Sequence, residues 1–306
     1  MTRFRRPPTH AGSWYSADKV ELQQQLRQWL DAVDITSKDR RPVVLISPHA
    51  GYRFSGETAA HGFAHLRHLE PRPKRIFVLG PSHCGYFQHC ALTMCQTYET
   101  PLGSFKVDQE VITDLKKSGL FMEMEQEWEW EEHSLEMQLP MLYEALHEDG
   151  GAEMPILVPV LVGAISDGQE AAYGRCFAPY LADPVSNVFV ISSDFCHWGQ
   201  RFRYTYLPSD AKNEPISEGI RQLDEEAMQW ITGGDVDAFH SYLKKTGNTI
   251  CGRHPIGILL NALQELKVHG PRVKFVHYAQ SSKAKSVSDS SVSYAAAVAS
   301  LEAGSA

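Results

Sequence analysis

The sequence has no long apolar run. No stretch approaches the roughly 20 apolar residues that cross a bilayer, and its first six residues, MTRFRR, lack the apolar segment of a secretory signal. Its six cysteines form no C-x-x-C pair and no spacing typical of a disulfide framework or a zinc knuckle. We therefore expect no membrane insertion, no export and a reducing compartment: the cytoplasm, with the nucleus also open.

Positive charge is scarce as well. The chain carries 29 Lys and Arg against 37 Asp and Glu, a net charge of -8 at pH 7, and no basic stripe interleaved with aromatic residues. Because nucleic-acid binding depends on such basic surfaces, we expect no nucleic-acid partner. The sequence also lacks a Gly-rich phosphate loop, a G-x-G-x-x-G fingerprint and a G-x-S-x-G elbow. Nucleotide-dependent and serine-hydrolase chemistry therefore have no support.

What remains is the composition of an ordinary soluble globular protein, with 43% hydrophobic and 22% charged residues. A chain of 306 residues can bury one large core, and α/β folds of this size often form one domain. We therefore expect residues 1–306 to fold as a single domain.

Short apolar runs bounded by turn residues alternate with amphipathic segments. This pattern predicts an α/β fold, with a mixed, mostly parallel central sheet and helices on both faces. The predicted strands are Pro42–Ser47, Arg75–Gly80, Pro155–Gly163, Asn187–Ser192, Lys274–Tyr278 and Val292–Ser300. The predicted helices are Glu21–Val33, Gly56–Leu69, Gln109–Ser118, His133–His147, Gln169–Leu181, Glu218–Ile231, Val236–Lys244 and Pro255–Val268. Ser55 and Asp108 suit helix N-caps, Gly119 suits a C-terminal cap and Pro255 suits a first helical turn.

Three predicted strands end in a loop that carries a potential metal ligand or proton carrier. Because the carboxyl ends of parallel strands diverge into a crevice at one edge of a sheet, side chains there are placed to bind ligands. A lone histidine after a strand is usually a surface or core residue, but the repetition predicts a functional site. The side chains at these strand ends are His49, His83, Asp194, Cys196 and His197.

Cys251 is a fourth candidate, since it comes just before a predicted helix. A thiol near a helix N-terminus has a lower pKa and favours the thiolate, the form that binds metals. An inert buried cysteine stays equally open. Arg253 would then either assist the thiolate or pair with a surface acid.

Other histidines give weaker signals. His61, His65 and His68 recur on one predicted helix at spacings that could chelate a metal, but without the carboxylate of H-E-x-x-H we interpret them as an ordinary helix face. His133 and Glu136 lie one helical turn apart, which fits either a proton carrier in the crevice or a surface pair.

Two segments are predicted to face solvent. Residues 122–132 hold six glutamates among Met and Trp residues, and we expect a solvated strand or loop face rather than an acidic ligand patch. Residues 281–291 are rich in serine with two lysines, which predicts a surface loop between the last two strands.

Seven motifs, spread from end to end, resemble those of the Memo family. They are HAGSWY at 10–15, PHAGY at 48–52, GPSH at 80–83, EHS at 132–134, SSDFCHWG at 192–199, CGRHP at 251–255 and DSSVSY at 289–294. The family is named for a mediator of receptor-tyrosine-kinase-driven cell motility. The resemblance implies a fold similar to that of class III (LigB-type) extradiol dioxygenases, which cleave aromatic rings with non-haem Fe(II).

By position, the resemblance makes His49, His83 and Cys251 the metal ligands, with Asp194 and His197 as catalytic candidates in the same pocket. The dioxygenases carry a carboxylate as the third ligand. Because a thiolate is softer, the cofactor implied here is copper, or iron with altered redox behaviour.

The resemblance further implies a redox and motility-signalling protein that binds phosphotyrosine-containing receptor or signalling segments. The implied binding residues are Trp14, near the mouth of the site, Tyr52, Phe54 and His133. Phe54 stands where some members have Tyr, so one hydroxyl is missing here.

Two alternatives stay open. In the first, the protein is an extradiol-type dioxygenase, or another metal-dependent oxidoreductase, and His197 serves as general base. The thiolate counts against ring cleavage, so we expect no dioxygenase activity of that kind. In the second, the pocket binds a peptide and the metal is incidental.

Overall fold

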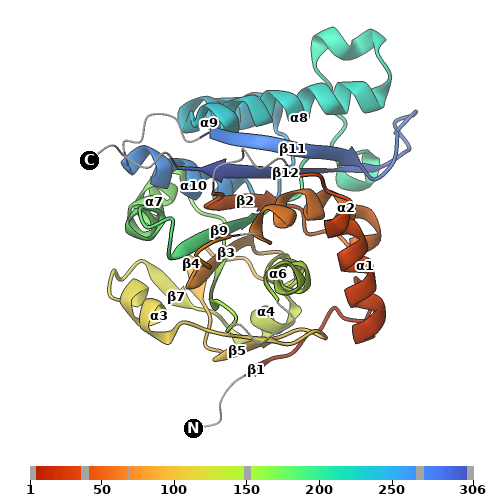
Figure 1. Cartoon of the computed structure of the whole chain (residues 1–306). Helices are drawn as coiled ribbons and strands as arrows, with labels where there is room; N and C mark the ends of the chain where they lie inside the picture. The colour runs from red at the N-terminus through yellow and green to blue at the C-terminus, as the bar shows by residue number, and fades with distance from the viewer. Residues whose placement is uncertain (1–4, 36–40, 68, 148–152, 267–271, 302–306) are drawn as a thin grey trace.

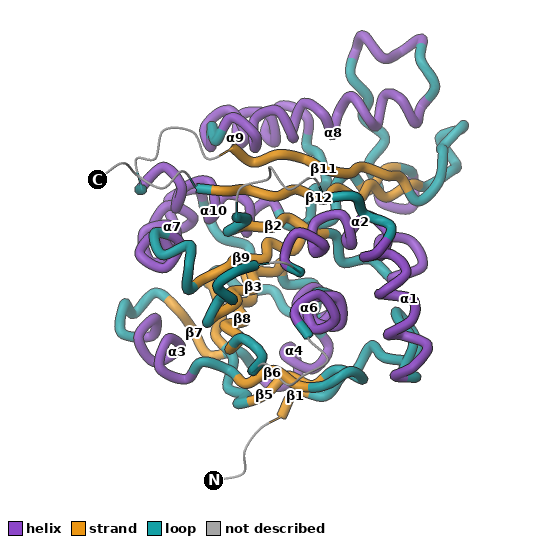
Figure 2. The backbone as a smooth tube through the Cα atoms, in the orientation of Figure 1, coloured by secondary structure: helices purple, strands orange, loops and turns teal. Residues whose placement is uncertain are grey.

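The computed structural model of the chain describes residues 5–35, 41–67, 69–147, 153–266 and 272–301. A mixed sheet runs through the molecule (Figures 1 and 2). Its strands are β2 (Val44–Ser47), β3 (Arg75–Pro81), β4 (Cys90–Leu92), β7 (Phe121–Glu123), β8 (Ile156–Val162), β9 (Asn187–Ser192), β10 (His197–Trp198), β11 (Arg272–Gln280) and β12 (Ser291–Ser300). Three more strands, β1 (Arg5–Arg6), β5 (Thr97–Glu99) and β6 (Ser104–Lys106), form a small second sheet.

The large sheet has its parallel strands in the middle. The strand order is β10-β12-β2-β9-β3-β8-β4-β7, with β11 paired to β12. Strands β2, β9, β3 and β8 are mutually parallel, whereas β12 is antiparallel to β2 and β4 is antiparallel to β8. The three strands β2, β9 and β3 are almost wholly buried, as expected of parallel strands that are covered on both faces.

Helices cover both faces of this sheet. They are α1 (Lys19–Asp31), α2 (Tyr52–Phe63), α3 (Gln109–Lys116), α4 (Gln126–Glu131), α5 (His133–Glu136), α6 (Leu139–Leu146), α7 (Asp167–Leu181), α8 (Ile216–Gly233), α9 (Val236–Thr246) and α10 (Arg253–Glu265). Figure 1 shows α7 and α10 on one side of the central strands, with α2 and α6 on the other. The predicted α/β class, with helices on both faces of a mixed sheet, is confirmed. Within the described ranges no helix is both long and apolar enough for a membrane span.

All six predicted strands are present, with their ends shifted by two residues or fewer. The prediction missed the strands of two or three residues and helix α4. The predicted helix His133–His147 is two helices, because Pro140 lies in the first turn of α6 and cannot continue a preceding helix. Ser55 is not an N-cap: it lies inside α2 and its hydroxyl donates to Ala50 O. Asp108 is an N-cap, and it accepts from the backbone of Glu110 and Val111.

The order of the central strands brings the site residues together. Strand β9 lies between β2 and β3, so the loops after these three parallel strands leave the same edge of the sheet. Helix α10 packs against β3 and β9. Cys251, just ahead of α10, is thereby held beside the loops that carry His49 and His83.

Candidate metal centre

Three side chains converge at this edge. One donor atom from each of His49, His83 and Cys251 lies within 4.8 Å of the other two. Cys251 Sγ is 3.2 Å from His49 Nε2, close to the roughly 3–3.5 Å that separates two donors on one ion with bonds of 2.0–2.3 Å. His49 is buried, while 31% of the His83 side chain is exposed, so the group is reachable from solvent.

The outer nitrogen of His49 is fixed by Ser192, the last residue of β9. Ser192 Oγ donates to Ser134 O at 2.7 Å and accepts from Gln138 Nε2 at 2.8 Å. Because its only proton is engaged, the 2.7 Å contact with His49 Nδ1 is a hydrogen bond donated by the ring. The Nδ1 proton of His49 is therefore held on the outer side, and Nε2, which faces Cys251, is the nitrogen left for a metal.

Glu132 plays the same part for His83. Its carboxylate accepts from His83 Nδ1 at 3.0 Å and from the His83 backbone N–H at 2.6 Å. It also caps α5 by accepting from Ser134 N. Burial opposes ionisation of Glu132, but the hydrogen bond and charge of His83 outweigh it and hold the pKa of this carboxyl well below its usual range. His83 therefore presents Nε2 to the centre.

The electrostatics favour a thiolate at Cys251. Burial acts to raise the pKa of the thiol, but the charge and hydrogen bond of His49, with a further hydrogen bond from His83, lower it to about 6. The backbone N–H of Asp194 donates to Cys251 Sγ at 3.2 Å. Gly252 permits this approach, since a Cβ there would collide with Ser193.

Asp194 borders the same group, and His197 acts electrostatically on Asp194. The Asp194 carboxylate accepts from the His49 backbone N–H at 2.8 Å, so it fixes the loop that carries this ligand, and burial raises its pKa. His197 Nδ1 lies 2.9 Å from Phe195 O and 3.2 Å from Thr249 O. Because carbonyl oxygens only accept, this nitrogen carries the proton and Nε2 keeps the lone pair.

His133 covers the centre from the side of α5. Its ring lies 4.4 Å from that of His83 and 5.4 Å from that of His49, and the Trp14 ring lies 4.5 Å away on another side. Burial, together with the charges of His49 and His83, lowers the pKa of His133 to about 3. His133 is therefore a neutral imidazole at pH 7.

Comparison with known proteins settles the family. The family model described as Memo-like protein matches residues 6–298. The chain belongs to the Memo-like family. It is 47% identical over 296 residues to Protein MEMO1 of Homo sapiens and of Mus musculus, which covers 95% of this chain and 96% of each relative. Protein memo-1 homolog of Caenorhabditis elegans is 44% identical over 297 residues, covering 96% of this chain and 82% of that one.

A solved structure shares the fold. The crystal structure of an uncharacterized protein from Escherichia coli K12 superposes with a TM-score of 0.50 and 15% identity, and it covers 83% of this chain and 99% of its own. At this identity the likeness concerns the α/β fold alone.

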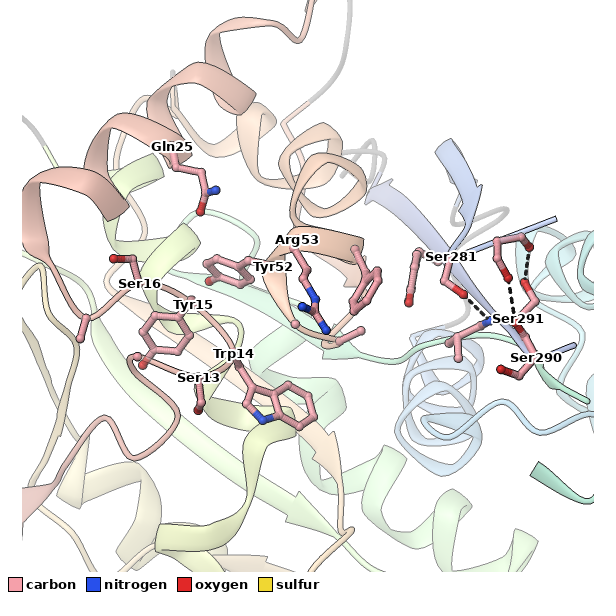
Figure 3. A pocket seen from close by; sticks show the side chains of 18 of the residues that line it. Ser13, Trp14, Tyr15, Ser16, Gln25, Tyr52, Arg53, Ser281, Ser290 and Ser291 are labelled. Atoms are coloured by element: carbon pink, nitrogen blue, oxygen red, sulfur yellow. Dashed lines mark hydrogen bonds between the residues drawn. The ribbon is translucent and has the colours of Figure 1, made fainter. Parts of the chain in front are cut away.

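In this Memo-like chain a large cavity lies next to His133, because Trp14, which contacts the His133 ring, is one of its lining residues. It measures about 880 Å³ and is lined by residues that include Trp14, Tyr52 and Phe54. Figure 3 shows Trp14, Tyr15, Tyr52 and Arg53 along one part of it, with Ser281, Ser290 and Ser291 across the opening. None of the three converging donors is among its described lining residues.

Two of these predicted binding residues have very different surroundings. Tyr52 is buried, and its hydroxyl donates to Met137 O at 2.8 Å and accepts from Met141 N at 3.3 Å. Phe54 is 47% exposed, and the Arg53 guanidinium lies 4.5 Å from its ring centroid. Tyr52 thus joins α2 to α6, whereas Phe54 offers an apolar surface to solvent.

The glutamate-rich segment corrects the expectation of a solvated face. Glu129 and Glu132 are buried, at 2% and 1% exposure. Glu129 accepts hydrogen bonds from Tyr98 and Thr93, while Glu132 holds His83. The spacing of the six glutamates in the sequence does not distinguish the two buried ones from their exposed neighbours.

Glu136 does not form a surface pair with His133, which was one of the two alternatives for these residues. It is buried and binds Arg6 at 2.6 Å, His10 Nδ1 at 2.9 Å and the Tyr15 hydroxyl at 2.5 Å. His133 instead has Glu132 Oε1 at 3.5 Å. The N-terminal motif HAGSWY is therefore tied to the wall of the site by Glu136.

The helix-borne histidines do not form a described metal group. His61 stacks on His277 with ring centroids 4.1 Å apart, whereas His68 lies outside the described residues. The serine-rich segment 281–291 is a connection between β11 and β12, as predicted. Ser192 and Glu132 were not predicted as supporting residues, although both lie inside the quoted motifs.

Proposed function

We propose that this Memo-like protein binds iron or copper through His49, His83 and Cys251, and that the centre serves redox signalling in cell motility or growth. The observation that carries the proposal is the orientation of the two rings. Each imidazole has its Nδ1 engaged by an outer partner, Ser192 or Glu132, which leaves Nε2 for a metal.

The donor set suits a soft or borderline metal. A thiolate with two neutral imidazoles favours copper, and also accommodates iron. When bound, such a metal would supply one-electron redox chemistry. The chain itself supplies the orienting hydrogen bonds, a neutral His133 ring beside the centre, and access along the exposed side of His83.

Elemental analysis after loading with Cu(I) or, anaerobically, with Fe(II) tests this proposal. We expect one equivalent of metal in the wild type and its loss in His49→Ala and Cys251→Ser. Cys84→Ser is the matched control, because Cys84 is an exposed cysteine next to His83 in the sequence but lies outside the converging group. Equal metal in all four proteins would refute the ligand assignment.

A phosphotyrosine-containing receptor or signalling segment is the partner we propose for the adjoining cavity. Arg53 and Arg201 line it together with Trp14 and Phe54, so cationic and aromatic groups occur side by side. Guanidinium groups recognise phosphate through paired hydrogen bonds. We place this encounter in the cytoplasm or nucleus.

Fluorescence anisotropy with a labelled phosphotyrosine peptide tests this partner. We expect binding that weakens in Arg53→Gln and disappears with the unphosphorylated peptide. Equal binding of the two peptides would contradict it. If Cys251→Ser binds the peptide as the wild type does, the pocket acts as a binding module without its metal.

An extradiol-type dioxygenase is the second candidate function. It is favoured by His197, which acts electrostatically on Asp194 beside the converging donors and could serve as a base. The third donor, a thiolate in place of a carboxylate, counts against it. Protein loaded anaerobically with Fe(II) would consume O2 with catechol-type diols, and flat oxygen traces across a diol panel would remove this candidate.

A further inference from the structure

A second group of imidazoles and carboxylates lies on the helices that cover one face of the sheet. It joins α7, α9 and α10, which lie next to one another in Figure 1. Donor atoms of Asp167, Glu170 and His240 all lie within 4.8 Å of one another. They line a cavity of about 380 Å³. The first group draws on other residues, namely His49, His83 and Cys251.

Glu170 is the buried centre of this group. Its side chain is 2% exposed, and one carboxylate oxygen lies 2.7 Å from His240 Nε2. The other lies 2.6 Å from His254 Nδ1, which fixes the orientation of the carboxylate. A Cβ on Gly257 of α10 would collide with this carboxylate, so the glycine leaves the space in which Glu170 lies.

The imidazoles compensate the buried carboxylate incompletely. Burial raises the pKa of Glu170 to about 7 despite the opposing charge and hydrogen bond of His240. Burial and the charge of Arg253 lower the pKa of His254 to about 4, so this ring is neutral and orients Glu170 without neutralising it. A divalent cation bound here would supply the missing positive charge.

Asp167 supplies the solvent-facing part of the group. Its carboxylate lies 3.6 Å from His240 Nδ1 and 3.2 Å from Lys244 Nζ. The side chain of Asp167 is 54% exposed and that of Lys244 is 75% exposed, so the lysine can swing away and leave an entry path. Lys244 is therefore a competitor for the same carboxylate.

We propose that Asp167, Glu170 and His240 form a second divalent-cation site, of the kind that binds Zn²⁺ or Mn²⁺, with His254 as the residue that positions Glu170. Two carboxylates and one imidazole are harder donors than the two imidazoles and thiolate of the first group. The two sites are thereby expected to divide metals by softness, copper at Cys251 and zinc or manganese at Glu170.

Equilibrium dialysis against Zn²⁺, followed by elemental analysis, tests this site in the full-length chain. The His83→Ala/Cys251→Ser variant removes the first group and also breaks the overlapping set of His83, Glu132 and His133, and we expect it to retain one equivalent of zinc. Adding Glu170→Gln or His240→Gln should abolish that equivalent. Adding His89→Gln, which removes an exposed imidazole outside both described groups, should leave it unchanged.

Two further readouts separate a metal site from an ordinary ion-pair network. Lys244→Gln should tighten zinc binding about two- to five-fold, the factor that one exposed ion pair supplies. Co²⁺ in the His83→Ala/Cys251→Ser variant should show visible bands without the sulfur charge-transfer band that a thiolate ligand produces.

The proposal fails if the variant lacking the first group retains no zinc, or if its zinc persists in both Glu170→Gln and His240→Gln. Circular dichroism establishes that each variant is folded. If Glu170→Gln does not fold, His240→Gln decides the question, because it leaves the contact between Glu170 and His254 in place. A failure of metal binding at Cys251 alone would leave this result unaffected, so the two proposals are separable.

Discussion

Cys251 and Glu170 are two acids that each lie between two imidazoles, and the protein shifts their pKa values in opposite directions. The pKa of the Cys251 thiol is lowered to about 6, whereas that of the Glu170 carboxyl is raised to about 7. The difference lies in the neighbours. His83, beside Cys251, has its own pKa raised to about 10: burial acts against this, but Cys251 and Glu132 outweigh it. His254, beside Glu170, is kept neutral by burial and by Arg253.

This comparison shows that counting imidazoles around an acid does not give its charge. What matters is whether each imidazole has a second anionic partner that keeps it protonated. Glu132 gives His83 such a partner. Asp167 acts to raise the pKa of His254, but burial and the charge of Arg253 outweigh it.

The largest expected effect is the loss of metal binding when the Cys251 thiol is removed. We expect Cys251→Ser to weaken copper or iron binding by more than about a hundred-fold, since even changes to outer-shell partners cost roughly 10–100-fold. Glu170→Gln should leave copper binding unchanged. Competition against a copper chelator of known affinity measures both, and equal losses in the two variants would contradict the distinction between the groups.

The pH dependence of protein stability tests the raised pKa of Glu170. Because its folded pKa of about 7 lies above the ordinary value of 4.5, the folded state holds more protons between these values, and stability falls as pH rises through this range. The loss from this group is roughly 3 kcal/mol. Urea unfolding of metal-free protein near pH 4.5 and near pH 8 should show a shallower pH dependence in Glu170→Gln. An unchanged dependence would mean that Glu170 does not titrate there.

Weakening the hydrogen bond from His83 to Glu132 should have a smaller effect on metal binding than removing the Cys251 thiol. We expect Glu132→Gln to weaken copper binding by about 10–100-fold, because the amide holds His83 Nδ1 less firmly and removes the charge that favours its basicity. His254→Gln is the matched control from the other group and should leave copper binding as it is. The same chelator competition measures both variants.

The rate at which Cys251 is alkylated tests its lowered pKa. In metal-free protein at neutral pH, Cys251 should react with iodoacetamide about ten-fold faster than the more exposed Cys84, whose pKa is raised to about 11 by burial and Glu132. Alkylation of Cys251 should fall as pH drops through about 6, where the thiolate is protonated. Peptide mapping by mass spectrometry reads out both residues, and equal rates would contradict a lowered Cys251 pKa.

The smallest expected effect is a difference in stability between two residues that line the cavity, the buried Tyr52 and the exposed Phe54. Tyr52→Phe should lower the free energy of unfolding by about 1 kcal/mol, because Met137 O and Met141 N lose a buried partner. Phe54→Tyr, at an exposed position, should stay within about 0.5 kcal/mol of the wild type. Urea unfolding compares the two, and an equal loss in both would show that Tyr52 has no special role in joining α2 to α6.

The first group could be anticipated from the sequence because it follows the strand pattern. His49 and His83 come after short apolar runs that predict buried parallel strands, and such strands place their carboxyl ends at one edge. Cys251 was assigned to the site by the family resemblance, because the sequence around residue 251 does not indicate which strand ends lie next to it.

The second group was not predicted, for a physical reason. Asp167, Glu170, His240 and His254 come from three helices, and their meeting depends on how α7, α9 and α10 pack, which hydrophobic periodicity does not specify. The inward turn of Glu132 was missed likewise, because it depends on a tertiary partner, His83.

X-ray absorption spectroscopy of the copper-loaded protein tests the central claim most directly. One sulfur and two imidazole nitrogens in the first coordination shell, with the sulfur lost in Cys251→Ser, is the predicted result. A shell without sulfur in the wild type, or one that Cys251→Ser leaves intact, would contradict the assignment of His49, His83 and Cys251 as the metal centre.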